Sequence, residues 1–146
     1  MNNNKNIVTS VETSEKLFKH LKDKIDTTFY WALSPMGWLL LYSVHNGFID
    51  INGRWFARDN FEEFYPAYLV SELNAMLPDF IGAEHLYTLQ YSRNWAKKDF
   101  QEHHLCYWHA GHDYLVSEYH DILVEVYAKV VLFVKENNYK LEHERR

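Results

Sequence analysis

The chain has 146 residues, of which 47% are hydrophobic and 24% are charged, and its net charge is −5 at pH 7 with histidine neutral. A chain of this length and composition can bury a core as one globular domain. The acidic balance argues against a duplex nucleic-acid binder, which needs a basic surface. The single cysteine, Cys106, excludes an internal disulfide and fits a reducing compartment.

The polar start of the chain and its short apolar runs predict a cytoplasmic protein. The first residues, MNNNKN, are polar and are not followed by the apolar segment of a signal peptide. The longest apolar run, Trp38–Tyr42, is far too short to span a bilayer. We therefore expect a single domain over residues 1–146 with no membrane partner, and we expect residues 1–8 and 138–146 to be mobile.

The first half of the chain predicts a helix followed by a meander. Thr9 and Glu12 have the spacing of a capping box, and an amphipathic stripe follows them, so we expect a helix over Val11–Ile25. The period then changes to that of strands, and two Asn-Gly pairs supply hairpin turns. About four strands are predicted up to Trp55–Ala57. One alternative remains open, because Trp38–Val44 also fits a helix that begins after Ser34.

The second half predicts a short helix and a hairpin. Pro66 suits the first position of a helix, and Pro78 would end it. Residues Glu84–Ser92 alternate as a strand, and His103–His109 is the expected return strand. The polar stretch Arg93–Glu102 is interpreted as the connection between the two strands.

A long C-terminal helix is predicted over Tyr114–Asn137, with Asp113 as its N-cap. A wide apolar stripe supports it: Leu115, Tyr119, Ile122, Leu123, Val126, Tyr127, Val130 and Val134. The predicted fold is therefore α+β, with a mostly antiparallel sheet of meander plus hairpin packed by about three helices. The longest helix is expected at the C-terminus.

One segment resembles a known group of sequences. FYPAYLVSELNAMLPDFI, residues 64–81, resembles the YPAP…ELLxxLP segment of small uncharacterised proteins carried by bacteriophages and other mobile elements of gut bacteria. Tyr68 stands where those proteins have a second proline. The resemblance covers about the second half of the chain, and it implies an α+β fold and a mobile-element origin but no activity. The positions that carry it are Tyr65, Pro66, Ala67, Glu72, Leu73, Leu77 and Pro78.

Four histidines and the only cysteine lie together in HHLCYWHAGHD, residues 103–113. Thiolate and imidazole are zinc ligands, so His104, Cys106, His109 and His112 form a candidate zinc site. The spacing matches no strong zinc motif, however, and side chains that alternate along a strand cannot all converge. We therefore expect no cofactor, and we keep zinc as the alternative.

The same region also suggests two kinds of catalytic chemistry. His112, Asp113 and His120 would gather near the start of the expected long helix, where an imidazole can act as an acid or base. A Cys106 nucleophile needs an adjacent base, but His104 lies two residues away along a strand, which is nearly 7 Å by the strand rise. An inert cysteine is the simpler interpretation.

The aromatic content is high, with five Trp, eleven Tyr and nine Phe. Trp and Arg are frequent anchors of protein interfaces, so the candidate binding residues are Arg93, Trp95, Lys97 and Lys98. The sequence therefore predicts a small non-enzymatic interaction or accessory protein, and the expected partner is another protein. The alternative is a metal-dependent or histidine-based enzyme centred on residues 103–120.

Overall fold

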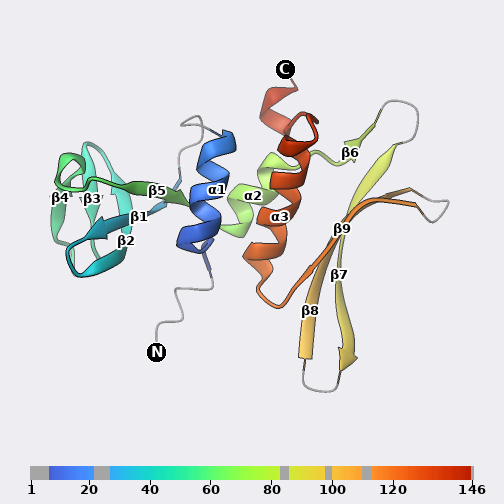
Figure 1. Ribbon diagram of the computed structural model, residues 1–146, viewed down its shortest axis with the longest axis horizontal. Helices are drawn as coiled ribbons and strands as arrows, with labels where there is room; N and C mark the ends of the chain where they lie inside the picture. The colour runs from blue at the N-terminus through green and yellow to red at the C-terminus, as the bar shows by residue number, and fades with distance from the viewer. Residues whose placement is uncertain (1–6, 22–26, 83–85, 98–99, 110–112, 146) are drawn as a thin grey trace. The chain divides into compact units, whose positions relative to one another are not determined.

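The computed structural model describes residues 7–21, 27–82, 86–97, 100–109 and 113–145, and it leaves the side chains of residues 94–97, 100 and 101 undescribed. The chain divides into two compact units, Met1–Leu69 and Val70–Arg146. The predicted α+β class is confirmed, because each unit contains an antiparallel sheet and helices (Figure 1). Whether the two units make one domain, as the length suggests, stays a prediction.

The first unit contains one helix and a five-stranded sheet. Its elements are α1 (Val11–Leu21), β1 (Phe29–Ser34), β2 (Gly37–Val44), β3 (Gly47–Ile49), β4 (Trp55–Ala57), the 3₁₀ turn η2 (Arg58–Asn60) and β5 (Phe64–Ala67). The strand order is β4-β3-β2-β1-β5, and all pairs are antiparallel. The predicted meander is confirmed, and the alternative of a helix over Trp38–Val44 is wrong.

Two faces of this sheet are covered differently. One face carries Ala32, Leu41 and Phe48, and Phe61 packs on it, with the Arg58 guanidinium 4.9 Å from the Phe48 ring centre. The other face is covered over β1 and β5 by α1 and the segment before it. The residues that make this second contact include Val8, Val11, Trp31 and Ala67, and Trp31 Nε1 donates to the Thr9 carbonyl at 2.8 Å.

Two expectations about the first unit need correction. The Ser10 hydroxyl, rather than that of Thr9, caps α1 by accepting from the Thr13 amide at 3.2 Å, because Thr9 turns inward to Ser14 at 2.6 Å. The predicted helix is present over Val11–Leu21, and the rest of the predicted span, residues 22–25, lies outside the described residues. Pro66 does not begin a helix but pairs with Tyr30 in β5. A proline fits there because β5 is an edge strand, where a missing N–H is tolerated.

The second unit contains two helices and a four-stranded sheet. Its elements are α2 (Val70–Met76), β6 (Phe80–Ile81), β7 (Tyr87–Lys97), β8 (Phe100–His109), β9 (Asp113–His120), α3 (Leu123–Glu136) and the 3₁₀ turn η3 (Glu142–Glu144). The strand order is β6-β7-β8-β9, again antiparallel. In Figure 1, α2 lies beside α3, and α3 contacts β8 and β9. The longest helix of the described residues is the last one, as predicted.

The sequence prediction for residues 113–120 of the second unit is wrong. They were predicted as the N-cap and first turns of a long helix, yet they form β9, and Asp113 pairs with His109 instead of capping α3. Pairing of β9 satisfies the backbone of β8, which would otherwise be a long exposed edge. The predicted apolar stripe was correct only from Leu123 onward, where Val126, Val130 and Val134 are fully buried.

The predicted connection Arg93–Glu102 is also wrong, because β7 runs on to Lys97 and β8 begins at Phe100. Polar residues are compatible with strands of an antiparallel sheet that has an exposed face. The tail expected to be mobile contains η3 and the fully buried side chain of Leu141. The mobility itself stays a prediction.

Candidate functional site

The histidine-rich segment forms β8, which lies between β7 and β9. Its side chains alternate between the two faces of the sheet. His104 and Cys106 share one face, whereas His103, Leu105, Tyr107 and His109 share the other, which packs against α3. The sequence prediction of this alternation is confirmed, and it divides the candidate ligands between two sides.

His104 is held by contacts to both ring nitrogens. Its Nδ1 lies 3.3 Å from the Ser92 hydroxyl, and its Nε2 lies 2.8 Å from the Ser117 hydroxyl. The ring stacks on Tyr119 with a centroid distance of 4.2 Å and an interplanar angle of 9°. Burial lowers the pKa of His104, so the ring is neutral near pH 7. Both ring nitrogens of His104 are therefore engaged by hydroxyl groups of the neighbouring strands.

Cys106 is also engaged in packing. Its side chain is buried, and Sγ donates to the Gln90 carbonyl at 3.7 Å. Burial raises the pKa of the thiol, which keeps it protonated and unreactive. His109 lies on the opposite face beside Tyr87, and His112 lies outside the described residues. Among the described residues, no three His, Cys, Asp or Glu side chains are placed to hold a metal ion.

The acid–base grouping predicted around residue 112 does not form within the described residues. Asp113 and His120 stand at opposite ends of β9. The strand pairing instead brings His103 and His120 together as direct partners, with Arg93 opposite His103 on β7. The Tyr91 hydroxyl lies 2.7 Å from His103 Nδ1. Sequence spacing missed this grouping, because His103 and His120 are brought together only by the unpredicted strand β9.

The predicted contact residues Arg93, Trp95 and Lys97 all lie on β7. Arg93 is exposed. The side chains of Trp95 and Lys97 are not described, and Lys98 lies outside the described residues. Their role in binding stays a prediction.

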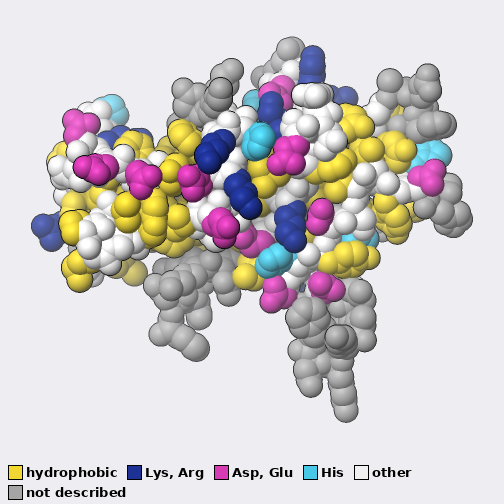
Figure 2. Space-filling model, viewed as in Figure 1, with side chains coloured by type: hydrophobic (Ala, Val, Ile, Leu, Met, Phe, Trp, Pro, Cys, Tyr) yellow, Lys and Arg dark blue, Asp and Glu magenta, His cyan; other side chains and the backbone are white. Residues whose placement is uncertain are grey.

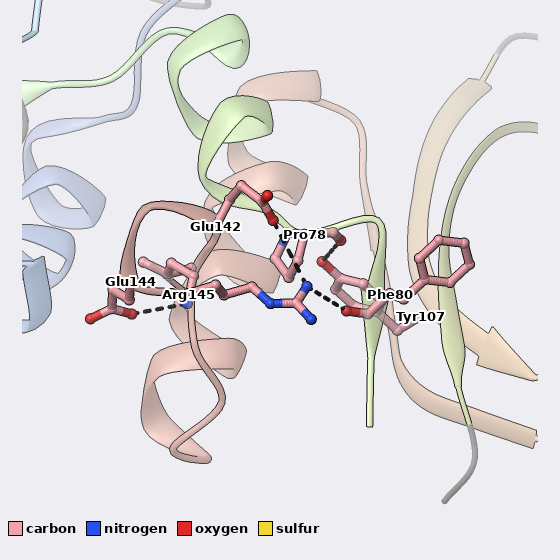
Figure 3. A network of polar contacts seen from close by, with 7 residues as sticks. Pro78, Phe80, Tyr107, Glu142, Glu144 and Arg145 are labelled. Atoms are coloured by element: carbon pink, nitrogen blue, oxygen red, sulfur yellow. Dashed lines mark hydrogen bonds and ion pairs between the residues drawn. The ribbon is translucent and has the colours of Figure 1, made fainter. Parts of the chain in front are cut away.

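A cavity of about 430 Å³ lies between β6 and the segment that follows α3. Phe80, Ile81 and Tyr139 form apolar walls, and Lys140 and Arg145 supply positive charge. Arg145 Nη1 donates to the Phe80 carbonyl at 3.2 Å and lies 3.8 Å from Glu142 Oε2 (Figure 3). Among the described residues, those that line the cavity include no carboxylate and no imidazole.

Two further sets of polar contacts involve segments next to this cavity. The Tyr107 hydroxyl donates to the Pro78 carbonyl at 2.6 Å (Figure 3). Glu144 accepts from the Leu141 amide at 2.9 Å and from Lys135 Nζ at 2.7 Å. These bonds pull the pKa of Glu144 down against the effect of its burial. The network ties the C-terminal turn to the end of α3, which is a structural role.

The first unit presents an apolar row across four strands. Direct register partners place four side chains side by side on the face that also carries Ala67: Trp55, Ile49, Tyr42 and Phe29. We call these four residues the apolar row. Trp55 and Tyr42 are 54% and 41% exposed. Hydrophobic side chains are visible at the surface over the strands of the first unit in Figure 2.

The indole of Trp55 lies directly against Gly47. A Cβ built on Gly47 would lie 2.5 Å from Trp55 Nε1 and 2.5 Å from the Phe56 carbonyl oxygen. Real side chains do not approach this closely, so only glycine accommodates the indole in this position. In the sequence, Gly47 belongs to the Asn46-Gly47 pair, which was interpreted only as a hairpin turn.

Comparison of the chain with protein-family models, curated protein sequences and solved structures finds no match. Among the described residues, the helices are too short or too polar to cross a bilayer. The described residues define an α+β fold with two antiparallel sheets.

Proposed function

We propose that the chain is a small, non-enzymatic, cytoplasmic interaction protein of mobile-element origin, and that the apolar row binds an extended segment of a partner protein. The observation that carries this proposal is the half-exposed Trp55 held over Gly47. An exposed indole that is fixed before binding loses little conformational freedom when a partner covers it.

The composition of the row supports contact with a protein. Trp and Tyr are enriched among the residues that dominate binding energy at protein interfaces. Tyr42 packs against Phe29 with a centroid distance of 4.9 Å, and Phe29 in turn lies beside the fully buried Ala67. The row therefore passes from the core of the unit to its surface, so its exposed end has a rigid base.

The position of the row favours an extended partner segment. The row ends at Trp55, and β4 is an edge strand of the sheet. An extended peptide can add to such an edge through main-chain hydrogen bonds, as in known modes of strand addition. A strand added beside β4 would place an apolar side chain next to Trp55 and continue the row.

The histidine-based enzyme is the less favoured function. Catalysis needs ionisable groups that converge in one concave site. In the second unit His104 and Cys106 are occupied by packing contacts, and the cavity of that unit is lined by cations and apolar groups. These observations give no support to a nucleophile or a metal-bound water.

Site-specific photo-crosslinking in the host tests the proposal. A photoreactive residue replaces Ile51, which is 75% exposed in the turn before β4, or Met36, which is 96% exposed in the turn between β1 and β2. We expect one discrete protein to be captured from position 51 and not from position 36, and we expect Trp55→Ala to abolish this capture. Equal patterns at both positions, capture that survives Trp55→Ala, or capture of only a second copy of the chain would contradict the proposal.

A further inference from the structure

The cavity between β6 and the segment that follows α3 has the size and the walls of a small-molecule site. Its volume of about 430 Å³ lies within the range of about 300–1,000 Å³ that is usual for ligand pockets. Phe80 is 48% exposed, so its ring offers apolar surface that a ligand could cover. The described residues that line the cavity all belong to the unit Val70–Arg146, so the site lies within one unit.

Contacts within the second unit hold the two aromatic residues of the cavity wall in place. The Phe80 carbonyl accepts from Arg145 Nη1 at 3.2 Å, and Phe80 pairs with β7 in the sheet (Figure 3). The Tyr139 amide donates to the Val134 carbonyl at 2.9 Å, and the Tyr139 ring stacks on Phe133 with a centroid distance of 6.4 Å. Because both aromatic residues are already ordered, little conformational freedom is lost when a ligand contacts them.

Lys140 and Arg145 bring two positive charges to the same cavity. A fixed turn positions them, because Leu141 is fully buried and its amide donates to Glu144 Oε1 at 2.9 Å. Within the part of the chain that the structure describes, Lys140 forms no ion pair. The side-chain contacts of Arg145 with described residues use Nη1, so the N–H groups at Nε and Nη2 can donate to a ligand.

Two carboxylates lie near the cavity but are not among the described residues that line it. Glu142 Oε2 is 3.8 Å from Arg145 Nη1, which exceeds the length of a hydrogen bond, and the Glu142 side chain is 58% exposed. Asp79 is exposed as well. Burial raises the pKa of Tyr107, Asp79 and Glu142 raise it further, and Arg145 lowers it, so all three charges lie near this hydroxyl. Ion pairs between exposed groups are weak because water screens them, so a ligand anion can displace Glu142 from Arg145.

We propose that this cavity binds a compact aromatic carboxylate of one or two fused rings. The ring system packs against Phe80 and Tyr139, since aromatic pairs gain energy from offset and edge contacts beyond the area that they bury. The carboxylate accepts hydrogen bonds from Lys140 and Arg145 in place of Glu142, and the planar guanidinium matches its two oxygens. This site lies in the second unit and is independent of the apolar row, so each can be tested without the other.

The test is an NMR titration of the isotope-labelled full chain with naphthoate at constant ionic strength. We expect saturable shifts of the backbone amide signals of Phe80, Ile81 and Lys140, while the amide signals of β4 in the first unit stay unchanged. Naphthamide has the same rings without the charge, and it should bind about tenfold more weakly because it loses the ion pairs with both cations. Acetate, which has the charge without the rings, should bind more weakly than naphthoate.

Four variants separate the roles of charge and ring. Lys140→Gln should weaken naphthoate binding about threefold, whereas Lys129→Gln, an exposed lysine of α3 that does not line the cavity, should leave it unchanged. Phe80→Ala should weaken binding about fivefold through loss of the ring contact. Glu142→Gln should tighten binding, because it removes the competing carboxylate. Absence of a saturable shift, equal affinity for naphthamide, equal affinity of the two lysine variants, an unaltered affinity of Phe80→Ala, or a failure of Glu142→Gln to tighten binding would overturn the proposal.

Discussion

Removal of a single buried hydroxyl, in Tyr107→Phe, tests how the second unit is held together. The Tyr107 side chain is fully buried, and its hydroxyl donates to the Pro78 carbonyl at 2.6 Å. Burial raises the pKa of this phenol, so it remains a donor at any pH at which the protein is folded. The substitution keeps the ring and leaves the buried Pro78 carbonyl without this donor. An unsatisfied buried acceptor costs about 1–3 kcal/mol, so the free energy of unfolding should fall by that amount.

Urea denaturation followed by circular dichroism measures this loss as a lower midpoint with an unchanged slope. Tyr119→Phe is the control, because Tyr119 is 43% exposed and contributes its ring, stacked on His104, to packing. Its free energy of unfolding should stay within about 0.5 kcal/mol of the parent, as for an ordinary surface change. The reasoning is refuted if Tyr107→Phe has the same midpoint as Tyr119→Phe and the parent.

Three other outcomes are expected in the second unit. Val126→Ala should lower the free energy of unfolding by about 1–3 kcal/mol in urea, because Val126 is fully buried in α3; an unchanged midpoint would show that α3 does not pack there. Native Cys106 should react with a thiol reagent far more slowly than the urea-unfolded chain, whereas equal rates would contradict its burial. Stability should fall as the pH drops below about 6.5, because burial lowers the pKa of His103 and His104 in the folded state, so the unfolded chain binds more protons there. His103→Gln/His104→Gln should flatten this dependence in urea titrations, and an equally steep fall would refute it.

The meander of the first unit could be predicted because its turns are encoded locally. Asn46 has a φ of +65° and Gly53 a φ of +81°, the backbone conformations that Asn-Gly pairs adopt readily. With the turns fixed, the aromatic and β-branched residues between them favour strands over the helix that Trp38–Val44 also fits. The register of β2 and β3 follows from the same turn.

Strand β9 could not be predicted because its sequence fits both periods. Leu115, Tyr119 and Ile122 have helical spacing, and they continue without a break into the true stripe of α3. The choice between helix and strand was made by tertiary pairing with β8, which is invisible to a local pattern. The same pairing brings together His103 and His120, which are 17 positions apart in the sequence.

The candidate sites, too, could be predicted only in part from the sequence. The alternation that separates His104 and Cys106 from His109 follows from strand geometry alone, and sequence reasoning obtained it. The position of Trp55 depends on the missing side chain at Gly47, its close neighbour on the adjacent strand. This contact depends on the pairing of β3 with β4, which the residue pattern alone does not show, and sequence reasoning selected Trp95 instead.

The affinity for the captured partner tests the central claim most directly. Isothermal titration of the purified partner into the parent chain, Trp55→Ala and Met36→Ala compares the apolar row with an exposed apolar residue outside it. Loss of a central Trp anchor of about 2 kcal/mol corresponds to about thirtyfold weaker binding for Trp55→Ala, with Met36→Ala equal to the parent. Equal affinity of all three proteins would contradict the assignment of the apolar row as the contact surface.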